Sequence, residues 1–362
     1  MFNDFYKGKK VLVTGHTGFK GSWLSTWLLN LGAEVTGYSI DLPSEPSLFE
    51  DVRLSEKITD IRGDVRDLNS LRGALDDHSP DLVFHLAAQP IVRRSYDDPV
   101  ETFTTNAIGS LNILEAVRES NSVKSLVMIT SDKAYRNVEW IWGYKEDDLL
   151  GGEDPYSSSK GCAELIFYSY INSYFKNNEK LSKLSTARAG NVIGGGDWAK
   201  DRIVPDIVRS FSKNEMLSIR APNATRPWQH VLEPLSGYLT LGEMQMKNAN
   251  LNHESFNFGP RDDVNQNVLR LVEEFSKYWD SGSWEVNKDD TKPEAGLLKL
   301  NCDKARTMLD WRAILSFEET IKFTGEWYKT YFENDVDLHE FTVQQISDYA
   351  QKAKKKGLKW AE

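Results

Sequence analysis

The sequence predicts an α/β protein with a doubly wound parallel sheet of the Rossmann type and a smaller, mixed α/β lobe towards its C-terminus. Short apolar runs rich in β-branched residues alternate with helix-like segments over the first 190 residues, at the spacing of βαβ units. A turn with three glycines directly follows the first of these runs. Beyond residue 190 the alternation loosens, and Gly, Pro, Trp and Arg become frequent. This change indicates a second lobe.

Each element of the first domain has its own signal. Strands are indicated by apolar, β-branched runs at 10–15, 34–40, 81–88, 125–130 and 184–194. Helices are indicated by apolar residues at helical spacing at 21–32, 100–120 and 156–176. The first helix is expected to stop at Gly32, because glycine commonly ends helices. The pattern places the first domain at 1–190 and the second mainly at 191–362, with about 226–260 returning to the first.

Composition limits the classes of function. The 362-residue chain has 40% hydrophobic and 27% charged residues, which is ordinary for a globular protein, and its formal net charge is −10. That charge disfavours a nucleic-acid or anionic-membrane surface. Cys162 and Cys302 cannot form a disulfide framework and lack the spacing of metal ligands. The N-terminus has no apolar signal-peptide core, and no run approaches about 18 apolar residues, so the expected location is the cytoplasm.

The glycine turn carries the first functional signal. Because it lies between a strand and a helix, its backbone amides can approach a pyrophosphate that the helix N-terminus stabilises. The loop residues expected to bind a dinucleotide are Gly15, Thr17, Gly18, Phe19, Lys20 and Gly21. Asp41 follows Gly21 by 20 positions and is placed to accept hydrogen bonds from the adenine ribose, with Ser39 as the alternative. Since no arginine directly follows the second strand, NAD is favoured over NADP.

A second signal follows the strand at 125–130. This apolar run ends in Ser131, Asp132 and Lys133, at the edge of a parallel sheet where ligands bind. Tyr156 and Lys160 lie four positions apart at the start of a predicted helix, so both side chains project from one face. A neighbouring ammonium favours the phenolate, so Lys160 is expected to lower the pKa of Tyr156. Such a pair can take a proton from a hydroxyl group while hydride leaves the same carbon.

These motifs resemble the extended short-chain dehydrogenase/reductase family. Its mark is the Gly-x-x-Gly-x-x-Gly spacing of the first turn, and Ser131, Tyr156 and Lys160 match its catalytic hydroxyl, base and lysine. Other runs similar to the family's are "HLAAQP" (85–90), "TNAIG" (105–109) and "GNVIG" (190–194). The resemblance implies cofactor contacts for Asp64, Val65, Leu86, Ala87, Ala88, Thr105, Thr130, Tyr156 and Lys160. It places Gln89 and Asn191 at the substrate.

Asp132 and Lys133 distinguish branches of that family. In its nucleotide-sugar 4,6-dehydratases, an acid at the position of Asp132 protonates the departing 6-hydroxyl, and a glutamate usually follows as the C5 base. Here Lys133 takes the glutamate's place, and a lysine can be a base only if desolvation or a nearby cation lowers its pKa. The Ser-Asp-Lys run, with "GHTGFKGSWL" (15–24) and "RPWQHVLEPLSGYL" (226–239), is similar to the CDP-glucose 4,6-dehydratase branch.

The resemblance to this branch implies a reaction without net redox change. C4 of CDP-D-glucose is oxidised with NAD, water is eliminated across C5 and C6, and the hydride returns to C6. Oxidation at C4 is needed because a ketone there makes the C5 proton acidic. The expected setting is deoxysugar biosynthesis for the O-antigen of lipopolysaccharide.

The remaining expectations concern partners and alternatives. Arg202 and Arg226 are expected to bind the substrate's pyrophosphate, because an arginine fork suits it, and Arg226 matches the family's pyrophosphate arginine. The family commonly forms homodimers through the Tyr156 helix and a helix near 102–118, so a homodimer is expected. Nothing in the residues themselves selects cytosine. The alternatives are a dTDP- or GDP-hexose dehydratase, a nucleotide-sugar 4-epimerase and a non-catalytic NAD-binding regulator.

Overall fold

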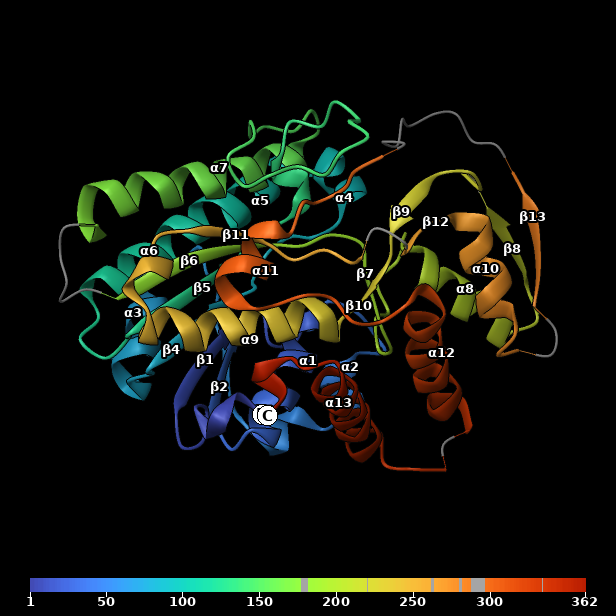
Figure 1. Ribbon diagram of the computed structural model, residues 1–362, viewed down its shortest axis with the longest axis horizontal. Coiled ribbons are helices and arrows are strands. Elements are labelled where there is room, and N and C mark those ends of the chain that lie inside the picture. The colour runs from blue at the N-terminus through green and yellow to red at the C-terminus, as the bar shows by residue number, and fades with distance from the viewer. Residues whose placement is uncertain (177–181, 220, 262–263, 280–281, 288–296, 334) are drawn as a thin grey trace.

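The computed structural model confirms the predicted parallel sheet. Seven strands lie in the order β11-β6-β5-β4-β1-β2-β3, all parallel (Figure 1). Their bounds are β1 (Lys10–Thr14), β2 (Glu34–Ser39), β3 (Thr59–Arg62), β4 (Leu82–His85), β5 (Ser125–Ile129), β6 (Lys183–Arg188) and β11 (Ser255–Asn257). The strand order reverses between β1 and β4, which is where open α/β sheets bind ligands. The structure describes residues 1–176, 182–219, 221–261, 264–279, 282–287, 297–333 and 335–362.

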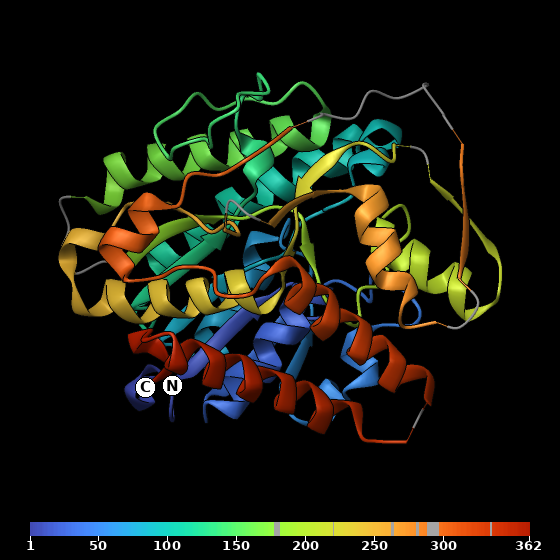
Figure 2. The ribbon, with the colours of Figure 1, turned by 45° about the vertical axis from the view of Figure 1, so that its right-hand side comes forward.

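Helices cover both faces of the sheet (Figures 1 and 2). One face carries α1 (Phe19–Asn30), α9 (Leu232–Lys247) and α13 (Leu338–Lys355). The other carries α3 (Leu68–His78), α6 (Gly109–Glu119) and α7 (Pro155–Tyr170). In β1, Val11 and Val13 pack in one hydrophobic cluster and Leu12 in the other, because alternate side chains of a strand point to opposite faces. Burial on both faces explains why these strands are continuous apolar runs.

The smaller lobe is assembled from short pieces. Its elements are α8 (Ile203–Ser212), β8 (Met216–Ile219), β9 (Thr225–Pro227), β12 (Asn265–Asn267), α10 (Val268–Ser276), β13 (Ser283–Val286) and α12 (Phe317–Glu333). β8 pairs in parallel with β13, and β9 pairs antiparallel with β12. Between these pairs, β10 (Gln229–His230) pairs with β7 (Val192–Ile193), and the chain continues through α9 to β11 of the large sheet. The domain boundaries predicted from the sequence stay predictions.

The other helical segments are short. The remaining α-helices are α2 (Leu48–Asp51), α4 (Val92–Asp97), α5 (Pro99–Phe103) and α11 (Asp303–Leu309). Among the described residues, the 3-10 segments are η1 (Phe2–Asp4), η2 (Leu54–Glu56), η4 (Asp132–Ala134), η6 (Ala249–Leu251) and η8 (Lys359–Ala361). In the same part of the chain, η3 (Thr104–Ile108) and η5 (Ile171–Phe175) are π-helical. The helices predicted at 100–120 and 156–176 therefore each contain a π-helical turn.

The single strand predicted at 184–194 is wrong. β6 ends at Arg188, and β7 covers only Val192–Ile193. The backbone at Asn191 explains the break, and Gly190 is constrained by its surroundings. Asn191 has φ +47°, a left-handed conformation that cannot continue a strand. Beside it, Gly190 faces the carboxylate of Asp132 so closely that a Cβ atom would lie 1.8 Å from Oδ2.

An aromatic cluster ties the C-terminus to the N-terminus. Trp360 stacks on Phe2 and on Tyr349, with ring centroids 5.3 Å and 5.7 Å apart. Trp27 of α1 meets Trp360 edge-on. Figure 2 shows the two termini side by side. The cluster holds α13 against α1, the helix that begins at the glycine turn.

Candidate active site

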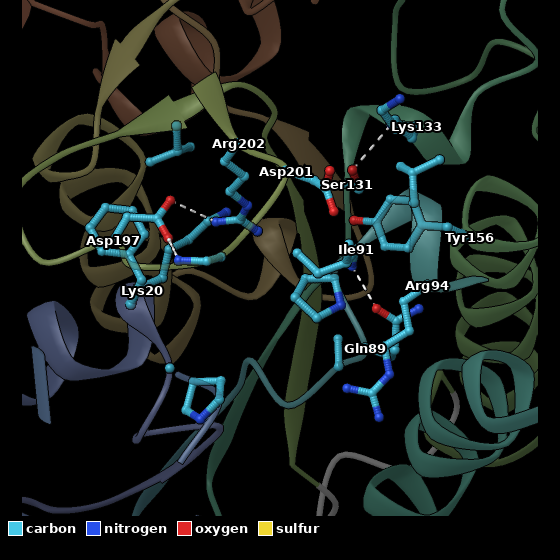
Figure 3. Close-up of a pocket in the computed structure, with 18 of the residues that line it drawn as sticks. Lys20, Gln89, Ile91, Arg94, Ser131, Lys133, Tyr156, Asp197, Asp201 and Arg202 are labelled. Atoms are coloured by element: carbon cyan, nitrogen blue, oxygen red, sulfur yellow. Dashed lines mark hydrogen bonds and ion pairs between the residues drawn. The ribbon is translucent and has the colours of Figure 1, made fainter. Parts of the chain in front are cut away.

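One large cavity lies at the carboxyl edge of the parallel sheet. It has a volume of about 1490 Å³ and is lined by the ends of β1, β2, β4 and β5 together with residues of the smaller lobe. All residues predicted above to be catalytic, cofactor-binding or substrate-binding lie in its lining. Figure 3 shows Ser131, Tyr156 and Gln89 on one side and Lys20, Asp197 and Arg202 opposite them. Predicted site residues as far apart in the sequence as Gly15 and Arg226 therefore meet around one space.

The glycine turn is shaped for close approach by a ligand. Gly15 has φ +75°, and a Cβ atom there would lie 2.7 Å from the Ala87 nitrogen. At Gly21, a Cβ atom would lie 2.0 Å from the Gly15 oxygen. α1 starts at Phe19, and its N-cap residue, Gly18, offers no side-chain acceptor to the amides of the first turn. These amides can bind a phosphate, so the turn fits the pyrophosphate of a dinucleotide.

Asp41 and Ser39 were the alternative residues for binding the adenine ribose, and their side chains differ in exposure and in their hydrogen bonds. The Ser39 hydroxyl is buried and hydrogen-bonded to His16 Nδ1 at 3.0 Å, and His16 Nε2 lies 2.9 Å from Asp60 Oδ1. Asp41 is exposed, and its Oδ1 accepts a hydrogen bond from the Leu42 amide at 2.7 Å. Thr17 donates its hydroxyl hydrogen to the backbone oxygen of Asp41 at 2.6 Å, which holds the residue beside the glycine turn. The Asp41 carboxylate thus retains acceptor capacity for a ribose.

The residues after β3, which were predicted to contact the cofactor, line part of the same cavity. Asp64 accepts a hydrogen bond from the Arg66 amide at 2.8 Å, and its carboxylate pairs with the Arg66 guanidinium. Val65 is buried, and a Cβ atom at Gly109 would lie 2.9 Å from its Cγ2. Asn112 donates to the Val65 oxygen at 3.0 Å, so α6 holds this turn in place.

The residues after β5 form a compact corner. Ser131 is the N-cap of η4, and its Oγ accepts a hydrogen bond from the Lys133 amide at 3.2 Å. The same hydroxyl donates to Asp132 Oδ1 at 3.0 Å. Figure 3 shows the Tyr156 hydroxyl directed towards Ser131. Ser131 therefore lies beside both the predicted base and the predicted acid. The Lys133 ammonium forms no ion pair within the described part of the chain.

The pKa of Tyr156 moves opposite to the sequence-based expectation. Burial raises it to about 12, and the charges of Asp132 and Asp154 add to the rise. The neighbouring Ser131 hydroxyl and the charge of Arg202 lower the pKa of Tyr156 and so act against burial. The expectation that Lys160 would bring the pKa of Tyr156 below that of a free phenol is wrong for this structure, because desolvation of the phenolate outweighs the attraction of nearby cations.

The pKa of Lys160 is also shifted from its usual value. Burial lowers its pKa to about 8, and the charge of Glu164, one helical turn later, acts in the opposite direction. Glu164 is buried and forms an ion pair with Arg188 at 2.8 Å. It also accepts the hydroxyl hydrogens of Thr130 and Thr186. The Thr130 hydroxyl is therefore engaged by Glu164, and only the rest of that residue can meet a cofactor.

Glu164 and Arg188 were missed in the sequence. The available signal was spacing, because Tyr156, Lys160 and Glu164 follow at intervals of four on one helix face. Their partner on β6 carries no local signal. A buried arginine becomes evident only when the strand is placed beside the helix.

On the substrate side, the predicted residues differ in how far their side chains are already engaged. The Gln89 amide donates to Thr102 Oγ1 at 2.8 Å, and its oxygen accepts from the Ile91 amide at 2.6 Å. A direct substrate contact by Gln89 would have to replace or share these bonds, so its predicted role stays a prediction. Arg202 donates to Asp197 Oδ2 at 2.9 Å. Arg226 lies on β9 and also lines the cavity.

The comparison with known proteins agrees with this geometry. Residues 12–324 match the sequence profile described as GDP-mannose 4,6 dehydratase. The chain belongs to the GDP-mannose 4,6 dehydratase family. Among relatives of this family, the CDP-glucose 4,6-dehydratase of Salmonella typhimurium strain LT2 is 47% identical, over 96% of this chain and 97% of its own length. The dTDP-D-glucose 4,6-dehydratase of Bos taurus is 24% identical, over 93% and 94%.

Solved structures share the fold of this GDP-mannose 4,6 dehydratase family member. An epimerase of Methanothermobacter thermautotrophicus superposes with a TM-score of 0.80 at 24% identity, over 92% of this chain and 96% of its own. The dTDP-glucose 4,6-dehydratase of Bacillus anthracis, in complex with NAD, has a TM-score of 0.75 at 20% identity, over 90% and 98%. At these identities the likeness concerns the fold alone.

Three further properties bear on the class of site. In the described ranges, no helix combines the length and apolarity needed to cross a bilayer. No group of three or more metal-ligating side chains is found among the same residues. Cys162 and Cys302 are not joined in a disulfide.

We predict that Lys160→Met makes the nucleotide-free protein more stable while abolishing catalysis. Below about pH 8 the lysine is charged in both states, and the folded state bears the cost of burying that charge. Removing it should raise the free energy of unfolding by about 2–4 kcal/mol near neutral pH. Because the lysine's pKa is 10.5 when unfolded, the gain should shrink as the pH rises from about 8 to 10.5.

Differential scanning fluorimetry across this pH range measures the effect. Lys322→Met is the matched control, because Lys322 is exposed on α12 and its ammonium lies 3.7 Å from Glu326. A lower melting temperature for Lys160→Met at neutral pH, with the control unchanged, would contradict the interpretation.

Proposed function

We propose that this protein is an NAD-dependent nucleotide-sugar 4,6-dehydratase acting on CDP-D-glucose. The observation that carries the proposal is the placement of Asp132 beside the Ser131–Tyr156 pair at one corner of the cavity. Ser131, Tyr156 and Lys160 suffice for oxidation and reduction of a sugar, whereas Asp132 supplies the acid that an elimination needs. The preference for CDP-glucose is supported by the 47% identity to an enzyme of that name.

The residues present fit NAD. The uncapped N-terminus of α1 and the turn from Gly15 to Gly21 suit its pyrophosphate, and Asp41 suits a ribose. Tyr156 and Lys160 lie at the far end of the same cavity, where the nicotinamide would meet the sugar. When bound, NAD accepts a hydride from C4 of the sugar and returns it to C6.

Residues of the protein carry out the proton transfers. Tyr156 takes the proton of the 4-hydroxyl as C4 is oxidised, and Lys133 removes the proton from C5. Asp132 protonates O6, so that water leaves. Lys133 then returns its proton to C5. Ser131 donates to Asp132 and faces the Tyr156 hydroxyl, so the proton taken from O4 can pass through the Ser131 hydroxyl to Asp132 and restore both groups. The product is the substrate less one water.

This function is tested with a panel of substrates. The protein is incubated with NAD and, separately, with CDP-, dTDP-, UDP- and GDP-hexoses, and the products are weighed by mass spectrometry. We expect CDP-D-glucose to lose 18 mass units, about one water, without net formation of NADH. Loss of water from a different nucleotide sugar would show that the enzyme prefers another nucleobase. An isomer of unchanged mass would favour an epimerase, and no turnover with any sugar would favour a non-catalytic NAD-binding protein.

We predict that the redox pair and the elimination group can be separated by mutation. Tyr156→Phe should slow C4 oxidation by about 100-fold or more, because the base is lost. Asp132→Asn should retain oxidation but slow the loss of water, since an amide cannot protonate O6. Solvent-deuterium incorporation at C5 reports oxidation followed by enolisation. Equal loss of exchange and of water release in both variants would contradict this division.

Gly190→Ala tests the same corner without replacing an ionisable residue. An added Cβ would overlap Asp132 Oδ2, so the carboxylate must move, and the variant should behave as Asp132→Asn does. The matched control is Gly73→Ala on α3, where a Cβ atom meets nothing within 4 Å. Unchanged dehydration by Gly190→Ala would show that the position of Asp132 does not limit the reaction.

We further propose that the protein forms a homodimer through α5, η3 and α7 and works in the cytoplasm. Val100, Ile108, Leu165 and Tyr168 are exposed on these elements, which pack against one another. An apolar surface spread over adjacent helices suits a two-fold contact with a second copy, which buries the same patch on both subunits. A reducing compartment is consistent with the two cysteines, which form no disulfide.

We predict that charges in the proposed dimer contact halve the molar mass of the protein in solution. Replacing Leu165 and Tyr168 with Glu should convert the dimer to a monomer, because two charges would be buried in the contact. Light scattering after size exclusion measures the change. Met216→Glu, at an exposed apolar residue of β8, is the control and should stay dimeric. A monomeric native protein would refute the proposal outright.

A further inference from the structure

Lys20 follows the glycine turn, and its side chain lies beside Asp197 of the smaller lobe (Figure 3). It lies in the first turn of α1, three residues before Trp23, so the two side chains leave the helix on neighbouring lines. Trp23 Nε1 donates to the Gly195 oxygen at 2.9 Å. Phe19 approaches the same segment, since a Cβ atom at Gly194 would lie 3.1 Å from its Cζ. This side of α1 therefore faces the segment 194–202 of the smaller lobe.

That segment carries an ion pair that is already complete. Asp197 is buried, and its Oδ2 accepts from Arg202 Nη1 at 2.9 Å. Its Oδ1 accepts from the Ala199 amide at 3.2 Å. Both carboxylate oxygens are thus occupied, and the Lys20 ammonium forms no hydrogen bond or ion pair of its own in the part of the chain that the structure describes. Figure 3 shows Lys20, Asp197 and Arg202 together on one wall of the cavity.

The electrostatics of this wall call for an anion. Burial lowers the pKa of Lys20 to about 8, and the charges of Arg202 and Lys160 lower it further against the opposing charges of Asp132 and Asp197. A lysine held beside an arginine is destabilised in its charged form unless a negative group joins them. A phosphate is the anion that such a cation pair suits, because arginine binds it through a fork and lysine as a point charge.

We propose that Lys20 and Arg202 together bind the phosphate that joins the nucleotide to the hexose, so that Lys20 belongs to the substrate site. The inference rests on the proposed function, since its ligand is the diphosphate of a nucleotide sugar. The cofactor's pyrophosphate is left to the amides of the glycine turn, which need no side-chain cation. The arrangement places the sugar-linked phosphate between the smaller lobe and the reacting corner, with Lys20 as a positioning residue for the hexose.

The test compares ligands that differ by one phosphate. Dissociation constants for CDP, CMP and NAD are measured by calorimetry for the wild type, Lys20→Met and Lys20→Arg. CDP carries the second phosphate and CMP lacks it. We expect Lys20→Met to weaken CDP by about tenfold or more and to leave CMP and NAD within about twofold. Lys20→Arg should keep most of the preference for CDP over CMP, which a merely structural role would not predict.

Other outcomes overturn the inference. Weaker NAD binding with unchanged CDP binding would make Lys20 a cofactor residue, and equal losses for all three ligands would make it structural. Lys322→Met serves as the control for the loss of a charge at an exposed site. The proposed function is judged separately, from the wild type alone. If the wild type binds none of CDP, dTDP, UDP and GDP, that function fails. If the wild type binds CDP and Lys20→Met binds it equally well, only the role of Lys20 is refuted.

Discussion

The buried ion pair between Glu164 and Arg188 is the interaction on which the candidate active site depends. Glu164 reaches from α7 to β6, where it meets Arg188 and Thr186, and to Thr130 at the end of β5. It thereby locks the helix that carries Tyr156 and Lys160 against the strand end that carries Ser131 and Asp132. Burying two charges is costly unless their hydrogen bonds are satisfied, and removing one partner of such a pair is strongly destabilising. The register between base and acid is therefore coupled to the stability of the domain.

Arg188 extends this constraint to the other side of the sheet. It donates to the Tyr135 hydroxyl and to the Glu146 oxygen, both at 2.8 Å, and the Tyr135 hydroxyl donates to Asn257 of β11 at 2.8 Å. The edge strand of the sheet, the chain after η4 and helix α7 are thus joined by one polar network. Such networks are rigid when every member is satisfied. Rigidity at this corner suits a reaction in which several proton transfers must be aligned on one sugar.

The charges of the cavity explain how a protein with a net charge of −10 can hold anionic ligands. The positive groups are local: Lys20 and Arg202 on one wall, Lys160 in the floor, and the amides at the start of α1. Burial lowers the pKa of Lys20 and Lys160 to about 8 and raises that of Tyr156 to about 12. These shifts record a cost in stability that the fold bears at its active site, which is where perturbed groups tend to gather.

Features that depend on neighbours along the chain could be predicted from the sequence. The alternation of strands and helices, the spacing of Gly15, Gly18 and Gly21, and the shared helix face of Tyr156 and Lys160 are local, and the structure contains each of them. Only the tertiary structure decided what depends on distant segments. The Asp132 carboxylate leaves no room for a side chain at Gly190, burial raises the pKa of Tyr156, and segment 194–202 forms the environment of Lys20. The physical reason is that burial and charge pairing arise between elements whose proximity no local pattern encodes.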